Sequence, residues 1–316
     1  MKEIEILVPG KLHAPTLERL TDMFTVHHCD AGQAHLIDPA IAKNIRGVAT
    51  MSGLNRAGIE ALPALEMISN FGVGYDAVDV KCAVEGSIMV SHTPNVLNEE
   101  VADTALGLLI NTARELPAAE VYLRAGKWEN SGAYPLTGAT LQGRTLGIFG
   151  LGRIGKAIAH RAEAFGLKIA YFGRSKQDIP YDYYDSLVGL AKAVDTLMIV
   201  APGTPETEKS VNLDVMQALG KNGIIINIGR GSVVDQSALI KALGDGTILA
   251  AGLDVFEDEP HVPDALLALP NAVLLPHVGS ASKATRNAMG ALVVDNLIGW
   301  FNDRTPLTPV PEMKPQ

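Results

Sequence analysis

Three polar residues, Arg230, Glu259 and His277, each follow an apolar strand-like run at a position that core packing does not require. Ligands of open α/β sheets bind at the carboxyl ends of the strands, so all three are expected on the functional edge. Reduction of a 2-keto acid needs an acid to protonate the forming alkoxide and a cation to hold the carboxylate. A histidine near a carboxylate suits the first task, and an arginine suits the second.

Taken singly, each of these residues has a simpler interpretation. A lone histidine is more often structural, and Glu257-Asp258-Glu259 resembles an ordinary solvated turn. Arg230 after a strand could instead bind a phosphate. Only their shared placement at strand ends favours the chemical interpretation.

A glycine-rich turn provides the second chemical feature. Thr145–Phe149 is expected to be a buried strand, and a G-x-G-x-x-G segment that opens a helix follows at once. The first glycine permits a tight turn, the second lets the backbone approach a pyrophosphate, and the third allows close helix packing. A plain strand–helix turn is the alternative. We predict a dinucleotide site formed by Gly150, Leu151, Gly152, Arg153, Ile154 and Gly155.

The loop after the next predicted strand indicates which dinucleotide binds. An NAD site places an acid there for the ribose hydroxyls. This chain instead reads Arg174-Ser175-Lys176, with no carboxylate until Asp178. Arg174 can stack on adenine and pair with a 2′-phosphate. We therefore predict NADP(H) as the preferred cofactor, with NAD(H) possible; solvated loop residues are the alternative.

Composition excludes several other classes. The net charge of -9 argues against a nucleic-acid surface, and two cysteines allow no disulfide framework. The eight histidines show no metal-ligand spacing, so no metal is expected. Glu3 and Glu5 interrupt the place where a signal peptide needs an apolar run, and we predict a cytoplasmic protein without a membrane span.

Strand-like and helix-like segments alternate along the chain, which is typical of α/β domains with parallel sheets. The predicted strands are too many for one open sheet, so we divide them between two domains. The predicted strands are Ile4–Val8, Gly47–Thr50, Met67–Ser69, Ile88–Ser91, Leu146–Phe149, Lys168–Phe172, Thr196–Val200, Ile224–Ile228, Ile248–Leu253 and Ala272–Leu275. The predicted helices include Ala14–Phe24, Glu99–Ala113, Arg153–Phe165, Ser237–Leu243 and Ser282–Phe301.

Five segments at characteristic spacing resemble the D-isomer-specific 2-hydroxyacid dehydrogenase family over nearly the whole chain. They are Asn70–Asp76, Gly150–Gly155, Asn227–Gly231, Gly252–Phe256 and Pro276–Gly279. The resemblance implies two Rossmann/flavodoxin-like domains, each a parallel sheet flanked by helices, with the active site in the cleft between them. It implies a discontinuous substrate-binding domain (1–98 plus 284–316) and an NADP-binding Rossmann domain with a dimerisation arm (99–283).

The same resemblance assigns roles to single residues. His277 would be the general acid/base, Glu259 its orienting partner and Arg230 the carboxylate anchor. The backbone N–H groups of Val73 and Gly74 would bind the substrate carboxylate as a small anion nest, although a structural turn is the alternative. The segment Met51–Leu54, at the end of the preceding predicted strand, is expected to form another wall of the pocket, so Leu54, Arg230 and His277 complete the predicted substrate set. Further cofactor contacts are implied at Pro202, Thr207, Ile228, Gly229, Arg230, Asp254, His277 and Gly279.

The resemblance also implies a homodimer built on the helical arm, in which Trp128 seals the interface or reaches an active site. The Arg174 loop is most similar to the NADPH-preferring branches, so we expect reduction of glyoxylate or hydroxypyruvate to the D-2-hydroxy acid. Hydroxyphenylpyruvate, phenylpyruvate and 2-ketogluconate are alternative substrates. A dinucleotide-sensing binding module, like the C-terminal-binding-protein co-repressors, is the alternative outside enzymes.

Overall fold

The computed structural model describes residues 1–313, and the chain divides into two compact units. Unit 1 comprises Met1–Leu97 and Ser282–Gln316, and unit 2 comprises Asn98–Ala281. The predicted boundaries lay within two residues of these positions. The roles predicted for the two domains, substrate binding and cofactor binding, stay predictions.

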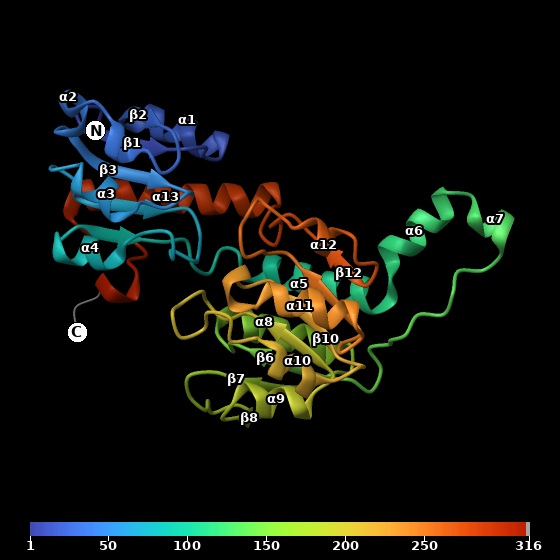
Figure 1. The fold of residues 1–316 in the computed structure, drawn as a ribbon. Helices are drawn as coiled ribbons and strands as arrows, with labels where there is room; N and C mark the ends of the chain where they lie inside the picture. The colour runs from blue at the N-terminus through green and yellow to red at the C-terminus, as the bar shows by residue number, and fades with distance from the viewer. Residues whose placement is uncertain (314–316) are drawn as a thin grey trace. The chain divides into compact units, whose positions relative to one another are not determined.

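Unit 1 is built on a five-stranded parallel sheet in the order β2-β1-β3-β4-β5. Helices α1 and α13 pack against each other, and α13 also packs on β3 and β4, so the last long helix closes the fold begun by the first residues (Figure 1). The strands are β1 Glu5–Pro9, β2 Thr25–Cys29, β3 Ile45–Thr50, β4 Met67–Asn70 and β5 Met89–Ser91. The helices are α1 Ala14–Met23, α2 Pro39–Ala42, α3 Arg56–Glu60, α4 Val80–Glu85 and α13 Lys283–Asp303, with 3₁₀ turns at Ala34–Leu36 and Pro311–Met313.

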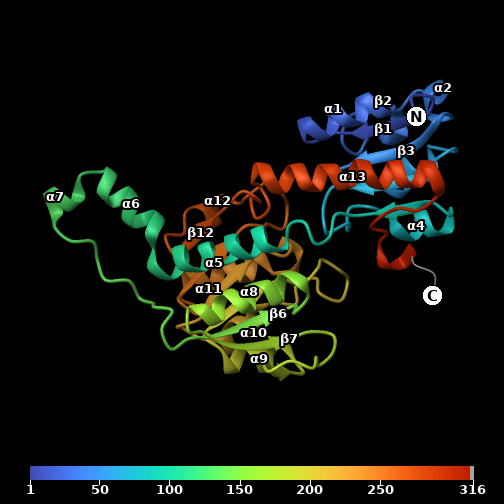
Figure 2. The ribbon, with the colours of Figure 1, turned by 180° about the vertical axis from the view of Figure 1, so that it is seen from behind.

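Unit 2 is built on a seven-stranded parallel sheet in the order β12-β11-β10-β9-β6-β7-β8. Helices α9, α10 and α11 cover one face, and α5 and α8 cover the other, as the two opposite views show (Figures 1 and 2). The strands are β6 Thr145–Phe149, β7 Lys168–Phe172, β8 Asp182–Tyr184, β9 Thr196–Ile199, β10 Ile224–Asn227, β11 Ala250–Leu253 and β12 Ala272–Leu274. The helices are α5 Asn98–Arg114, α6 Leu116–Arg124, α7 Lys127–Ser131, α8 Arg153–Ala164, α9 Leu187–Ala193, α10 Leu213–Leu219, α11 Gln236–Gly244 and α12 Asp264–Leu267, with a 3₁₀ turn at Gly231–Val233.

The central strands owe their position to their side chains. Strands β9, β10 and β11 are buried at every residue, as expected where helices cover both faces of a parallel sheet. The predicted α/β fold with parallel sheets is therefore confirmed. Two strands were missed, β2 and β8, because both lie at sheet edges and carry partly exposed polar or tyrosine side chains. An edge strand needs no continuous apolar run.

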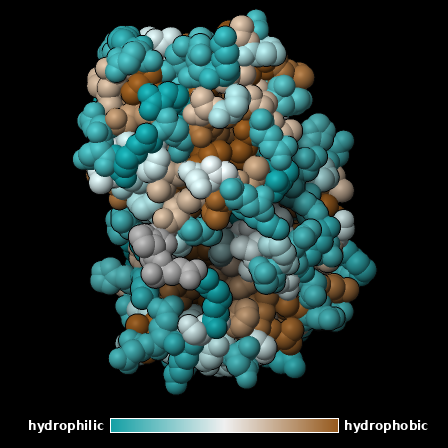
Figure 3. Space-filling view, turned by 90° about the vertical axis from the view of Figure 1, so that its left-hand side faces the viewer, coloured by the Kyte–Doolittle hydropathy of each residue, from teal (hydrophilic) through white to brown (hydrophobic). Residues whose placement is uncertain are grey.

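Helices α6 and α7 form an arm that extends away from the sheet of unit 2. None of their residues is buried within the chain. Within residues 1–313, no helix is both long and apolar enough to cross a bilayer. The face drawn in Figure 3 is largely hydrophilic, with hydrophobic side chains in small patches, which is ordinary for a folded surface.

Candidate active site

His277 and Glu259 form the central contact of the site. Nδ1 of His277 lies 2.7 Å from Oε2 of Glu259, and Oε1 of Glu259 accepts a hydrogen bond from the Phe256 N–H at 3.0 Å. The two residues follow the neighbouring strands β12 and β11. Because Nδ1 faces the carboxylate, Nε2 is the ring atom left to exchange a proton with a ligand.

The surroundings of the Glu259 carboxyl group favour its ionised form. Burial opposes its ionisation, but the hydrogen bond and charge of His277 lower the pKa of Glu259 below its ordinary value of 4.5, helped by the Phe256 N–H and the charge of Arg230. Glu259 is therefore ionised at neutral pH. The ionised carboxylate can accept a hydrogen bond from the His277 Nδ1–H.

Asp254 holds the backbone around His277. Its carboxylate accepts hydrogen bonds from Val278 N at 2.7 Å and Gly279 N at 2.8 Å, while its carbonyl accepts one from His277 N at 2.9 Å. Burial raises the pKa of Asp254, although the two backbone bonds act in the opposite direction. His277 adopts a φ of 53°, a left-handed conformation that non-glycine residues rarely take without support. We attribute the fixed direction of the His277 side chain to this support.

Arg230 lies in a loop that Asn227 fastens to strand β10. The side chain of Asn227 donates to Arg230 O at 2.9 Å and accepts from Gly229 N at 3.1 Å. Arg230 Nη1 donates to Gly229 O at 2.8 Å. Gly231 must be a glycine, because a Cβ there would meet the Phe256 carbonyl carbon at 1.9 Å. Close backbone packing thus joins the Arg230 loop to the segment that leads to Glu259.

The residues of the acidic turn Glu257-Asp258-Glu259 have different partners. Glu257 forms an ion pair with Lys209, with Oε1 and Nζ 2.7 Å apart, whereas Glu259 contacts His277. The backbone carbonyl of Asp258 accepts from His261 N. All three residues of the turn are exposed, and Glu257 and Glu259 each have a charged or imidazole side-chain partner in addition.

The glycine turn after β6 has the geometry of a dinucleotide cradle. Gly150 has a φ of +100°, and a Cβ there would meet Ala201 N at 2.8 Å; a Cβ on Gly155 would meet Gly150 O at 2.4 Å. A Cβ on Gly152 would meet no protein atom within 4 Å. The protein itself thus requires Gly150 and Gly155, while Gly152 keeps open the space at the start of α8. Helix N-termini bind phosphates, so the residues present fit a pyrophosphate.

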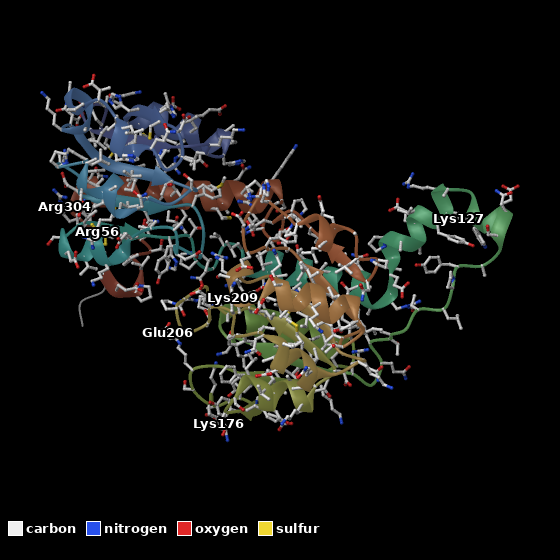
Figure 4. The ribbon with its side chains drawn as sticks, in the orientation of Figure 1. Arg56, Lys127, Lys176, Glu206, Lys209 and Arg304 are labelled. Carbon is white, nitrogen blue, oxygen red and sulfur yellow. The ribbon has the colours of Figure 1, made fainter. Side chains whose placement is uncertain are left out.

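The loop of Arg174, Ser175 and Lys176 follows β7 and exposes all three side chains; Lys176 marks its position in Figure 4. Gln177 ties this loop to the glycine turn, because its Nε2 donates to Leu151 O at 2.8 Å and its N–H donates to Tyr171 Oη at 2.6 Å. Sequence reasoning missed Gln177, since a lone glutamine after a strand carries no signal of its own.

The other predicted cofactor residues lie in the loops that follow the neighbouring strands of the same sheet. Thr207 Oγ1 donates to Pro202 O at 2.6 Å and shapes the loop after β9, where Figure 4 labels the neighbouring Glu206 and Lys209. Ile228 is buried, and a Cβ on Gly229 would meet Ala201 O at 2.8 Å. Gly279 lies against Asp254, as described above. Cofactor contacts at these positions stay predictions.

The residues predicted in unit 1 are described separately. Val73 and Gly74 lie in the loop after β4 and are partly exposed. Leu54 is only 4% exposed and packs in the core of unit 1, whereas Met51 is 47% exposed. A role for these residues in substrate binding stays a prediction. Among residues 1–313, no group of three or more His, Cys, Asp or Glu side chains is arranged to hold a metal ion.

The fold and the site define a nicotinamide-dependent oxidoreductase. Residues 106–279 match the model of the "D-isomer specific 2-hydroxyacid dehydrogenase, NAD binding domain". The chain belongs to the D-isomer-specific 2-hydroxyacid dehydrogenase family. The predicted family, enzyme class and nicotinamide dinucleotide cofactor are thereby confirmed.

Several reductases are similar to this chain over most of its length. A solved structure of the NADPH-dependent glyoxylate/hydroxypyruvate reductase of Sinorhizobium meliloti, in complex with NADP and malonate, is 54% identical and covers 98% of both chains with a TM-score of 0.96. Glyoxylate/hydroxypyruvate reductase A of Arabidopsis thaliana is 49% identical over 82% of both chains. Hydroxyphenylpyruvate reductase of Plectranthus scutellarioides is 48% identical over 85% of this chain and 86% of its own.

Proposed function

We propose that this protein reduces a small 2-keto acid, with glyoxylate or hydroxypyruvate favoured, to the D-2-hydroxy acid with NADPH. The observation that carries the proposal is the 2.7 Å contact of His277 and Glu259 beside the Arg230 loop. The similarity to an NADPH-dependent glyoxylate/hydroxypyruvate reductase over 98% of the chain supports the substrate and the cofactor.

In this proposal the bound dinucleotide supplies the hydride, and the protein supplies the rest. Arg230 and the N–H groups of Val73 and Gly74 hold the substrate carboxylate. Protonated His277 donates a hydrogen bond from Nε2 to the keto oxygen and transfers that proton as the carbonyl becomes an alcohol. The neutral ring keeps its Nδ1–H bond to Glu259, so no charge is stranded on the carboxylate. One 2-keto acid, one hydride and one proton give one 2-hydroxy acid.

The exposed loop Arg174-Ser175-Lys176 supports the preference for NADPH, since it offers two cations and a hydroxyl and no carboxylate. The hydrogen bond from Gln177 to Leu151 connects this loop to the glycine turn, which supports a shared site for the adenosine and the pyrophosphate. Pro202, Thr207, Ile228, Gly229, Asp254 and Gly279 would line the remainder of the dinucleotide.

Turnover tests the proposal. Purified protein is offered glyoxylate, hydroxypyruvate, hydroxyphenylpyruvate, phenylpyruvate and 2-ketogluconate with NADPH and with NADH, and oxidation is followed by absorbance. We expect the highest kcat/KM with glyoxylate or hydroxypyruvate and NADPH, and a loss of about 10²- to 10⁴-fold in kcat for His277→Ala. No NADPH oxidation with any keto acid would instead favour the dinucleotide-sensing binding module.

A homodimer and a cytoplasmic location belong to the same proposal. The arm exposes Val121 at 66%, Leu123 at 54% and Trp128 at 65%, which is typical of a surface that a partner covers. Figure 4 labels Lys127, next to Trp128, in this arm. Light scattering of the wild type should give twice the chain mass, and Val121→Asp should shift the protein to monomer. A monomeric wild type would contradict the dimer.

A further inference from the structure

His92 lies directly after β5 and contacts the loop of Val73 and Gly74. Its Nδ1 is 2.9 Å from Val73 O, and its side chain is buried, with 8% of the residue exposed. A carbonyl oxygen only accepts hydrogen bonds, so Nδ1 carries the proton. His92 is therefore the donor in this hydrogen bond, and Val73 O is the acceptor.

The other carbonyls of the loop are held as well. Thr93 N donates to Gly72 O at 2.9 Å, and Asn70 Nδ2 donates to Gly74 O at 2.9 Å. Within residues 1–313, the hydrogen bonds of the structure provide no protein acceptor for the N–H groups of Val73 and Gly74. The carbonyls of this loop are occupied while two N–H groups are left for a ligand.

The geometry of a trans peptide relates the bond at Val73 O to the direction of the Gly74 N–H. The C=O and N–H of one peptide unit point in opposite directions. Val73 O and Gly74 N belong to one unit, and Gly72 O and Val73 N belong to the preceding one. A donor that holds Val73 O on one side thus orients the Gly74 N–H toward the other side, and polarises the unit along the same line.

His92 is itself held in place. Its ring stands edge-on to Tyr75, with centroids 5.3 Å apart and planes at 88°. Thr308 Oγ1 donates to His92 O at 2.6 Å, and Thr308 O accepts from His92 N at 3.1 Å. Asn296 of α13 holds Thr308 through Nδ2 to Oγ1 at 2.9 Å. The Thr308 bonds hold the backbone of His92, and the contact with Tyr75 limits the movement of its ring.

We propose that His92 is a positioning residue for the substrate carboxylate: its Nδ1–H fixes the Val73–Gly74 peptide so that the Gly74 N–H donates to the carboxylate. The inference rests on the proposed reduction of a 2-keto acid. It predicts an effect on the binding of carboxylate ligands that is separate from the proton transfer at His277.

Three variants test the role of His92. His92→Leu removes the donor with similar bulk, and His92→Asn restores it, because Asn Nδ2 occupies nearly the position of His Nδ1. His27→Leu is the matched control, since His27 Nε2 also makes one side-chain bond in unit 1, 2.7 Å from Glu5, away from the loop. Measurements are kcat, KM for glyoxylate and for NADPH, and the inhibition constant of oxalate, across pH.

We expect His92→Leu to raise KM for glyoxylate and the inhibition constant of oxalate about tenfold, which one lost hydrogen bond can account for. The values of kcat and KM for NADPH should stay within about twofold, and the pH at which the rate falls should not move. His92→Asn and His27→Leu should resemble the wild type. A folded, active His92→Leu with unchanged KM overturns the inference, and so does a His92→Asn as impaired as His92→Leu.

Thr308→Val is the second variant if His92→Leu does not fold, because it removes the bond from Thr308 Oγ1 to His92 O, together with the bond that Asn296 Nδ2 donates to the same oxygen. A rise of about threefold in KM for glyoxylate supports the inference, and an unchanged KM overturns it. Failure of the proposed function can be distinguished from failure of the role of His92. A wild type that neither reduces keto acids nor binds oxalate refutes both proposals, whereas an active wild type with an indifferent His92→Leu refutes only this one.

Discussion

His277 and Glu259 contact each other through Nδ1 and Oε2 at 2.7 Å, while the second carboxylate oxygen accepts the Phe256 N–H. The carboxylate is therefore held from two sides and cannot rotate away from the imidazole without losing a backbone hydrogen bond. The contact determines which ring nitrogen is free. Because the pKa of Glu259 is lowered, the carboxylate in this contact is ionised at neutral pH.

Glu259→Gln should alter the pH profile of reduction. Because burial is outweighed by the contact with His277, the pKa of Glu259 is lowered below 4.5 and the carboxylate is ionised throughout the working range. The carboxamide does not titrate, so the fall in kcat/KM that protonation of Glu259 causes below its lowered pKa should be missing from the variant. The rate near neutrality should drop about 10- to 100-fold.

Glu257→Gln is the matched control for Glu259→Gln. Glu257 lies two residues from Glu259 in the same turn, but its carboxylate pairs with Lys209 and not with His277. Its pH profile should match that of the wild type. An equal change in the pH profile of kcat/KM in both variants would mean that general surface charge, and not the contact with His277, determines that profile.

Gly152→Ala and Gly155→Ala should separate cofactor binding from folding. An added Cβ at Gly152 meets no protein atom within 4 Å, whereas one at Gly155 meets Gly150 O at 2.4 Å. We expect Gly152→Ala to keep its Tm within about 2 °C and weaken NADPH binding about tenfold or more, and Gly155→Ala to lower Tm by several degrees. Fluorescence titration with NADPH and thermal melts measure both. Unchanged NADPH affinity in Gly152→Ala would refute the cradle.

Arg174→Asp should reverse the preference between dinucleotides. The substitution removes a cation and adds an acid that repels a 2′-phosphate and can accept from a ribose hydroxyl. The ratio of kcat/KM for NADPH over NADH should fall about 100-fold. Lys168→Asp makes the same charge change at the opposite end of β7, where the side chain is also exposed, and should leave the ratio unchanged. A preference of the wild type for NADH would refute the role of Arg174.

Glu66→Gln should lower stability in a way that depends on pH. Burial opposes ionisation of Glu66, but Arg46, with Nε 2.6 Å from its carboxylate, and Arg304 lower the pKa of Glu66 below 4.5. A lowered folded-state pKa adds stability above the ordinary value, and this stability is lost as pH falls through the lowered pKa. Urea unfolding at pH 7 should show a loss of about 1 kcal/mol that shrinks toward pH 3. A difference that is constant with pH would contradict the assignment.

Sequence patterns were sufficient for the features that depend on local chain properties. Alternating apolar and helical segments predicted the parallel α/β fold, and the glycine spacing marked the turn after β6, because buried strands and tight turns restrict which residues they accept. Arg230, Glu259 and His277 stood out as polar residues just beyond apolar runs. Strands β2 and β8 escaped notice because an edge strand can be polar and partly exposed.

Contacts between distant segments required the folded chain. Only the packing of β11 beside β12 brings Glu259 to His277 rather than leaving it, like Glu257, with another partner. Gln177 and His92 contact neighbouring loops through one or two side-chain or backbone hydrogen bonds, and nothing in their own neighbourhood along the chain distinguishes them from ordinary polar residues. Residue types and spacing thus predict which chemistry is available. Which carboxylate, amide or imidazole performs it depends on distances of a few ångströms between residues far apart in sequence.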